Sequence, residues 1–408
     1  MTMHQWSAGL AAAGLITLPS LVWAEEKLSP VLTALSTTTI SGYVSTSAQW
    51  NPGTGNANPP NIAFNQGKQD GFNLDVVKLT LERPLEEAQW SAGYKVDLFL
   101  GPDANTFASQ STAAFGGTSD FAVRQAFVDL KVPVGNGLEF KLGVWDPIMG
   151  YEVTDLPNNR NYTRSYGYFI EPISHTGLLA TYPVSSWLTL NAGVANTFGP
   201  TINQRAFPTV LDATKTRAES YKSYMGSIVL TAPDSLGFLK GSTAYLSAMN
   251  GFNTTAPVAA GGGKADQTSL YAGATLNTPI TNLKVGVAVD YVFIAHQPLT
   301  ADKSFYADAY GLYVNYQLTE KLSLNGRGEY ASTDANGYLT PSRVGTHGAK
   351  VIELTGTLQY DVWKNVLSRL EFRWDHAADG QNSFGGRAPG NPSSENAFVV
   401  AANMVYKF

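Results

Sequence analysis

The segment from Asn396 to Phe408 alternates apolar residues with small or polar ones along its whole length. Side chains of a β-strand point to opposite faces in turn, so one face of this strand would be entirely apolar. An apolar edge strand promotes aggregation in water, whereas a strand that closes a barrel in lipid has no free edge. The pattern therefore favours a transmembrane β-barrel. The residues of the apolar face are Phe398, Val400, Ala402, Met404, Tyr406 and Phe408.

Composition agrees with β-structure and excludes several kinds of site. The 408 residues include 39 glycines and 20 tyrosines, only 14% are charged, and none is cysteine. Without cysteine there can be no disulfide, thiolate metal site or cysteine nucleophile. Beyond residue 24, no stretch reaches the roughly 18 uncharged apolar residues that a spanning helix needs. The net charge of −5 and the lack of basic clusters argue against nucleic acid as a partner.

The amino terminus has the features of a secretory signal. Residues Ser7 to Ala24 are largely apolar and Glu25-Glu26 follows them, although Met1 to Trp6 contains no Lys or Arg. This arrangement predicts export with cleavage after Ala24. We expect residues 1–24 to be a signal peptide, 25–37 a short periplasmic segment and 38–408 a barrel in the outer membrane of a Gram-negative bacterium.

About sixteen segments have the length and residue pattern of barrel strands, and together they predict an all-β, antiparallel transmembrane barrel. These segments are Thr38–Trp50, Phe72–Arg83, Gln89–Leu100, Asp120–Val132, Leu138–Trp145, Ser174–Tyr182, Trp187–Phe198, Glu219–Thr231, Phe238–Asn250, Gln267–Thr278, Leu283–His296, Phe305–Leu318, Lys321–Thr333, Gly348–Asp361, Val366–Ala377 and Asn396–Phe408. Two of them, Phe72–Arg83 and Asp120–Val132, change their alternation midway, near Val76-Val77 and Gln125, which predicts β-bulges.

Short and long connections alternate between these segments. Short ones such as Pro133–Asn136 follow the even-numbered strands, and long ones such as Asp146–Ile173 follow the odd-numbered strands; Gln297–Ser304 is fairly short for that set. Short periplasmic turns and long external loops are typical of outer-membrane barrels. We therefore expect both ends of the chain on the periplasmic side.

A soluble sandwich would also show alternating strands, so the alternation alone does not decide between the two folds. The aromatic residues favour the membrane, because they fall at the predicted strand ends, where interfacial girdles lie. They are Trp90, Trp187, Trp363, Tyr406 and Phe408 at the periplasmic ends and Trp50 and Trp374 at the outer ends.

A barrel of this size would hold water, so some segment must narrow it. The longest connection, Asp146–Ile173, is rich in charged and aromatic residues. Folded into the lumen, it would face wall cations and create a transverse field that sorts polar solutes; the alternative is a loop over the rim. The candidate constriction residues are Glu152, Asp155, Arg160, Arg164 and Glu171 in the loop and Lys78, Lys95 and Arg124 on the wall. Inward charges of both signs nearly balance, so strong ion selectivity is not predicted.

The chain contains several short motifs in and around its longest connection: Gly143-Val144-Trp145 through Gly150-Tyr151-Glu152, Asn159-Arg160-Asn161-Tyr162, Ser165-Tyr166 and Pro172-Ile173-Ser174-His175-Thr176-Gly177. With the terminal Phe408, these motifs resemble the outer-membrane porins, and among them the putative beta-barrel porin-2 group. The resemblance implies passive diffusion of small hydrophilic solutes. The acidic, glycine-containing third-loop motif of general trimeric porins is not intact, so monomer and homotrimer both stay open.

The other expected partners are outer-membrane lipid, the barrel-assembly machinery and periplasmic chaperones. Tyr406 and Phe408 are the candidate C-terminal assembly signal for that machinery. These two aromatic residues lie on the apolar face of the last predicted strand, where assembly and lipid contact would both involve them.

An enzyme is not expected. His175, His296, His347 and His376 are scattered without metal-ligand spacing, and there is no Gly-x-Ser-x-Gly turn. We therefore predict no catalytic, cofactor-binding or metal-binding residues. Two alternatives to a porin remain open: a surface barrel that acts as an adhesin or structural protein, and an outer-membrane lipid hydrolase.

Overall fold

The computed structural model describes residues 37–53, 55–65, 67–107, 119–204, 222–252, 266–297, 303–334, 339–340 and 348–408. The predicted signal peptide, most of the predicted periplasmic segment and His347 lie outside these residues. Residues Thr39–Phe408 form one compact unit. No helix within the described ranges is both long and apolar enough to cross a membrane.

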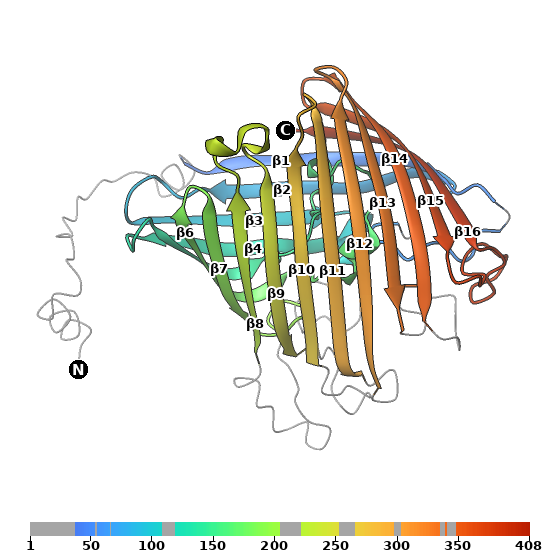
Figure 1. Cartoon of the computed structure of the whole chain (residues 1–408), viewed down its shortest axis with the longest axis horizontal. Coiled ribbons are helices and arrows are strands. Elements are labelled where there is room, and N and C mark those ends of the chain that lie inside the picture. Colours follow the sequence, from blue (N-terminus) through green and yellow to red (C-terminus); the bar gives the residue numbers. More distant parts are fainter. Residues whose placement is uncertain are drawn as a thin grey trace, which may run out of the picture. The chain divides into compact units, whose positions relative to one another are not determined.

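This unit is a closed antiparallel barrel in which every strand pairs with its neighbours along the chain and β1 pairs with β16 (Figure 1). The strands are β1 (Thr39–Trp50), β2 (Gly71–Arg83), β3 (Ser91–Leu100), β4 (Phe121–Val132), β5 (Leu138–Trp145), β6 (His175–Ser185), β7 (Leu188–Ala195), β8 (Ser223–Thr231), β9 (Thr243–Phe252), β10 (Asp266–Asn277), β11 (Leu283–Gln297), β12 (Lys303–Gln317), β13 (Leu322–Thr333), β14 (Ala349–Trp363), β15 (Val366–Ala377) and β16 (Asn396–Lys407). The predicted fold class and the sixteen strands are confirmed, since each predicted segment overlaps one observed strand.

The connections alternate in length as predicted except at two places, since residues 298–302 alone join β11 to β12 whereas residues 232–242 join β8 to β9. Residues 364–365 alone join β14 to β15, and Asn365 adopts a φ of 71°, a conformation that Asn tolerates in tight hairpins. The connection between β8 and β9 contains the 3-10 helix η3 (Asp234–Leu239), which Figure 1 shows at the same end of the barrel as the carboxyl terminus. The predicted strand start at Phe238 is therefore wrong, because β9 begins at Thr243. The longest connection, residues 146–174, joins β5 to β6.

The outer surface of the barrel is apolar, as the alternation predicts. On β16 the side chains of Met404, Tyr406 and Phe408 are about half exposed, whereas Val399 and Val405 on the opposite parity are fully buried. Phe408 also closes the barrel against β1, because its backbone N–H donates to the carbonyl of Gly42 and the N–H of Gly42 donates back, each at 3.0 Å. The apolar parity of the last strand is therefore the lipid-facing one.

Two bulges interrupt the alternation at the predicted places. The register of β2 against β1 skips Asp75, and the register of β4 against β3 skips Arg124. A bulge puts two successive residues on one face. Asp75 with Val76, and Arg124 with Gln125, are accordingly all buried inside the barrel.

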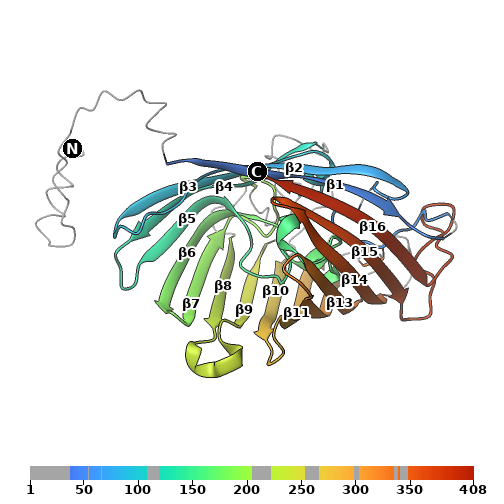
Figure 2. The same cartoon turned by 90° about the horizontal axis from the view of Figure 1, so that it is seen from above.

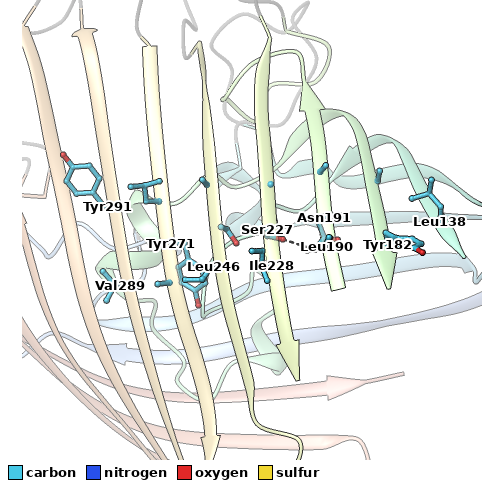
Figure 3. A pocket seen from close by; sticks show the side chains of 17 residues that line it. Leu138, Tyr182, Leu190, Asn191, Ser227, Ile228, Leu246, Tyr271, Val289 and Tyr291 are labelled. Atoms are coloured by element: carbon cyan, nitrogen blue, oxygen red, sulfur yellow. Dashed lines mark hydrogen bonds between the residues drawn. The ribbon is translucent and has the colours of Figure 1, made fainter. Parts of the chain in front are cut away.

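A cavity of about 920 Å³ is a groove on the outer face across β5 to β11 and not a passage through the barrel (Figure 3). Its floor contains small residues that are neighbours in register: Ala180, Ala192, Gly226 and Ala248. Exposed apolar side chains such as Leu190, Ile228 and Leu246 line it. Since these residues belong to the lipid-facing parity, the groove belongs to the membrane surface of the barrel.

Candidate functional site

Residues 146–174, here called the third loop, fold into the lumen. The loop contains the 3-10 helix η2 (Leu156–Asn158) and the short helix α3 (Tyr166–Ile170), which begins where Ser165 Oγ accepts the N–H of Tyr168 at 3.0 Å. Figure 2 shows this green helical segment inside the ring of strands. The loop therefore occupies the interior of the barrel and does not lie over its rim.

One side of the loop is bound to β2–β4 through Asp155. Lys78 Nζ on β2 lies 2.7 Å from the Asp155 carboxylate and 3.2 Å from Asp97 on β3. Arg124, the bulge residue of β4, donates to Asp97 at 2.8 Å and also pairs with Asp146 at the start of the loop. The bulge thus supplies the guanidinium that joins the wall to the beginning of the loop.

The other side of the loop is bound to β13 and β14 through Arg327. Its Nη1 lies 2.7 Å from Glu152 Oε1 and 2.8 Å from the carbonyl oxygen of Thr163, both in the loop. Its Nε donates to Glu353 on β14 at 3.0 Å. Arg327, Glu152 and Glu353 are all buried. Removing one partner of a buried ion pair strongly destabilises the fold, because the other charge is left buried without compensation. Separation of the loop from β13 would leave these charges in that state.

A second arginine, Arg373 on β15, supports the same side. It pairs with Asp375 at 2.7 Å and donates to the backbone carbonyl of Arg164 at 2.6 Å. Asp375 in turn accepts the hydroxyl of Tyr166 at 2.9 Å. This contact fixes the first residue of α3 against β15.

Wall carboxylates also satisfy the backbone of the loop. The N–H groups of Tyr166 and Gly167, at the start of α3, donate to Glu329 on β13 at 2.6 and 2.7 Å. Those of Tyr162 and Thr163 donate to Glu371 on β15 at 2.6 and 2.8 Å. The first N–H groups of a helix have no partner within it, and an acceptor with negative charge suits them.

Arg164 holds the loop together internally. Its guanidinium donates to the carbonyl oxygens of Tyr162 and Thr154 at 3.0 and 2.9 Å. It also lies over the rings of Phe64 and Tyr168, 5.3 and 5.6 Å from their centroids, at cation–π distance. Arg164 is buried, so it acts on the shape of the loop and not directly on the water-filled space.

The first external loop contributes a cation that no pattern in the sequence selects. Lys68 Nζ lies 2.7 Å from Asp75, the bulge residue of β2, and 2.6 Å from Asp103 in the 3-10 helix η1 (Pro102–Thr106). Burial alone would lower the pKa of Lys68, but Asp103, Tyr162 and Asp75 together raise it above its ordinary value. Tyr162 donates its hydroxyl to Asp75 at 2.9 Å, so three external connections meet at one buried cluster.

Near its carboxyl end the loop meets β11 through two acids. The carboxyl group of Glu171 interacts electrostatically with that of Asp290 on β11. Burial, and then the charge of Asp290, raise the pKa of Glu171 well above its ordinary value. Two carboxyl groups in contact share a proton more readily than they bear two charges, so this contact depends on protonation.

Space remains between the third loop and the wall on the side of β7 to β13. A cavity of about 420 Å³ lies between the loop and β7–β10, and one of about 230 Å³ lies between the loop and β10–β13. Tyr151 lines both cavities. Its ring stacks on Tyr313 with centroids 3.9 Å apart, and its hydroxyl lies 3.3 Å from Thr275 Oγ1. The loop thus divides the lumen into two narrow spaces with Tyr151 between them.

The remaining predicted constriction residues lie in different places. Arg160 is exposed and lines the smaller cavity together with Lys284 of β11. Lys95 pairs with Glu82 at 3.5 Å and has no ion pair with the third loop within the described part of the chain. Arg327 and Arg373 were not among the constriction candidates, although their inward parity marks them as lumen residues.

The comparisons agree with this architecture. Residues 37–408 match the family described as putative beta-barrel porin-2, OmpL-like. No curated protein sequence gives a significant match.

Among solved structures, the chain is similar to the anion-selective porin from Comamonas acidovorans, with 14% identity and a TM-score of 0.55 over 91% of this chain and 99% of that one. It is similar to the trimer form of in-vitro folded OmpT of Vibrio cholerae, with 12% identity, a TM-score of 0.55 and coverage of 91% and 99%. It is also similar to Salmonella typhi OmpF in complex with daunomycin, with 13% identity, a TM-score of 0.54 and coverage of 91% and 97%.

Identities this low establish the fold of the chain, and the family match establishes what kind of barrel it is. A sixteen-stranded barrel with an apolar outer face and a polar lumen is the architecture of an outer-membrane channel. The chain is an outer-membrane porin of the Gram-negative type and belongs to the putative beta-barrel porin-2, OmpL-like family.

Proposed function

We propose that the third loop sets the width of the channel and that small hydrophilic solutes diffuse through the spaces it leaves beside β7 to β13. One observation carries this proposal. The ion pair between Glu152 and Arg327 joins the loop to β13, which is eight strands along from β5 in a barrel of sixteen. A loop that leaves the wall at β5 and is bound half way around the barrel must cross the lumen.

The polar contacts of the loop support conduction and not catalysis as its role. Asp155 and Glu152 are engaged in ion pairs with wall cations, and Arg164 donates to carbonyl oxygens of its own loop. Groups held in this way shape a passage, because none of them is free to act as a nucleophile or general base. An assay for lipid hydrolysis tests the enzyme alternative, and a conductance measurement tests the adhesin alternative.

The decisive experiment is single-channel conductance in a planar bilayer. Protein purified in detergent from outer membranes would be compared with a variant that lacks Gly150 to Tyr168. Discrete steps that enlarge on deletion are the expected result. Steps of unchanged size would place the narrowest point of the channel outside the third loop. A folded barrel without steps would contradict the proposal that the protein is a channel.

Folding of the deletion variant needs its own control. Heat-modifiable migration in gels reports a closed barrel independently of conductance. Tyr151→Ala is the matched milder variant, since it removes only the ring between the two cavities. A larger conductance in this variant would support a passage beside Tyr151 even where the deletion prevents assembly.

We further infer that the protein is exported with cleavage after Ala24. The apolar segment that ends at Ala24 and the acidic pair after it support this inference. Amino-terminal sequencing of protein isolated from outer membranes tests it, with Glu25 as the expected first residue. A first residue upstream of Ser7 would contradict it.

We also propose a homotrimer as the assembly in the membrane. The similar OmpT structure in its trimer form supports this state. Small residues in the outer groove would allow close approach of another barrel or of lipid. The mass of the protein–detergent complex decides between the trimer and a monomer.

A further inference from the structure

Two cations face the smaller cavity from opposite sides. Arg160 comes from the third loop and Lys284 from β11, and both side chains are exposed to the space. Neither has an ion-pair or hydrogen-bond partner among the residues that the structure describes. The two charges are therefore available to whatever occupies the cavity.

The acids around this cavity do not neutralise the two cations. Glu152 is the one carboxylate that lines the cavity among the described residues, and it is bound to Arg327 at 2.7 Å. Asp155, nearby in the loop, is bound to Lys78 at 2.7 Å. Because these negative charges are paired with buried cations, the field in the cavity is dominated by Arg160 and Lys284.

Two buried arginines strengthen the same field. Arg369 on β15 lies within electrostatic range of both Arg160 and Arg164. The guanidinium of Arg369 donates to the carbonyl oxygen of Leu156 at 3.2 Å, and that of Arg164 also donates to carbonyl oxygens. A carbonyl oxygen satisfies the donor but leaves the unit charge of Arg164 in place, so Arg164 adds positive potential near the passage. Glu371 offsets part of the charge of Arg369, which adds less.

The rest of the lining suits an oxyanion. Asn158 and Asn315 bring side-chain amides to the cavity, and the ring of Tyr313 forms part of its wall. Amide N–H groups can donate to carboxylate or phosphate oxygens, and cations give charge-assisted hydrogen bonds to the same groups. With a volume of about 230 Å³, the cavity admits a small anion.

We propose that the cavity lined by Arg160 and Lys284 is a binding subsite for small oxyanions, carboxylates or phosphate, on their way through the channel. This inference rests on the proposed passage beside the third loop. The sequence predicts a near balance of inward charges, whereas this cavity carries an excess of positive charge. The reason is that the buried charges neutralise one another and the exposed charges of Arg160 and Lys284 do not.

Ion selectivity tests the subsite directly. Reversal potentials under a gradient of potassium chloride would be measured for the wild type, Arg160→Gln, Lys284→Gln and the double variant. Each substitution should lower the permeability of chloride relative to potassium by about three- to fivefold, the effect of one unit charge close to an ion in water. Lys95→Gln is the matched control, since it also removes a charge from the lumen but does not line the cavity.

Competition identifies the class of ligand. Malonate and inorganic phosphate would be added separately to wild-type channels that carry chloride, with glycerol as the neutral control. We expect either oxyanion to reduce the chloride current at concentrations that leave the double variant unaffected. A response to malonate alone would assign the subsite to carboxylates, and a response to phosphate alone would assign it to phosphate.

The outcomes separate this inference from the proposed function. Normal conductance steps, with a permeability ratio in the double variant equal to that of Lys95→Gln, would overturn the oxyanion subsite and leave the porin intact. No steps from a folded wild-type barrel would overturn both. Because Arg160 and Lys284 are exposed and without partners in the described structure, folding of the variants is expected to be normal, and heat-modifiable migration checks it.

Discussion

Arg327 Nη1 lies 2.7 Å from Glu152 Oε1, and this buried ion pair joins the wall of the barrel to a loop that starts eight strands away. The same guanidinium also donates to Glu353 at 3.0 Å. One side chain therefore compensates two buried carboxylates. Charge pairing across the lumen therefore holds the third loop together with apolar packing, in which Leu156, Tyr166 and Ile170 of the loop take part.

Replacement of that arginine should release the loop. Arg327→Gln leaves Glu152 buried without a cation and Glu353 with Arg373 alone, at 3.9 Å. This is expected to lower the free energy of unfolding by about 3–5 kcal/mol. Single-channel steps should become larger and noisier. Urea unfolding in lipid vesicles and bilayer recordings measure the two effects, with Lys95→Gln as the control. Equal free energies of unfolding for the two variants would show that this ion pair does not stabilise the barrel.

On the other side of the lumen, a double-mutant cycle can measure the coupling energy between Lys78 and Asp155. Asp155→Asn leaves Lys78 with Asp97 at 3.2 Å, whereas Lys78→Met removes a cation from both acids. We expect the lysine variant to be the less stable, with a coupling energy of about 1–3 kcal/mol between the two positions. Additive effects of the two substitutions would show that the contact does not hold the loop.

The pairing of Glu171 with Asp290 predicts a dependence on pH. Because the pKa of Glu171 is raised, its contribution to stability is complete below the ordinary glutamate pKa and is lost as the pH rises through the raised value. Conductance noise from loop movement should therefore increase as the pH rises above the ordinary glutamate pKa of about 4.3. Glu171→Gln, which keeps a hydrogen-bonding group without the titration, should give flat noise; a slope that persists would assign the titration elsewhere.

A glycine on the wall defines the position of Tyr151. A Cβ atom at Gly286 would lie 1.9 Å from Tyr151 Oη, so Gly286→Ala must displace the ring from its stack on Tyr313. We expect this variant to change single-channel conductance in the wild-type background and to have no effect in a Tyr151→Ala background. An equal change in both backgrounds would mean that the added methyl group acts on some other part of the passage.

The carboxyl-terminal residue should matter for assembly. Phe408→Ala keeps the backbone hydrogen bonds to Gly42 but removes the aromatic ring of the candidate assembly signal. We expect a several-fold smaller yield of heat-modifiable barrel in outer membranes. Phe372→Ala is the matched control, because that side chain is 51% exposed on the same outer face against 50% for Phe408. Equal yields would assign Phe408 to lipid contact only.

Alternation along the chain was sufficient to predict the strands, because each strand must present one face to lipid and one to water. The same parity identified Arg327 and Arg373 as lumen residues and located the bulges near Val76 and Gln125. It could not show which of these side chains meet the third loop, since such contacts join positions far apart in the chain. Lys68 lies in a connection without periodicity, so no local pattern connects it with Asp75.

The two bulges have a consequence for how such a channel can change its chemistry. On β2, Leu74 and Val77 face outward on either side of Asp75 and Val76, and on β4, Val123 and Ala126 flank Arg124 and Gln125 in the same way. Removing Asp75 or Arg124 from the sequence would leave a regularly alternating strand with every lipid-facing residue in place. Each bulge is therefore a one-residue insertion that adds a charge to the lumen without altering the membrane surface. A wall built in this way can acquire or lose an ionic group by the gain or loss of a single codon.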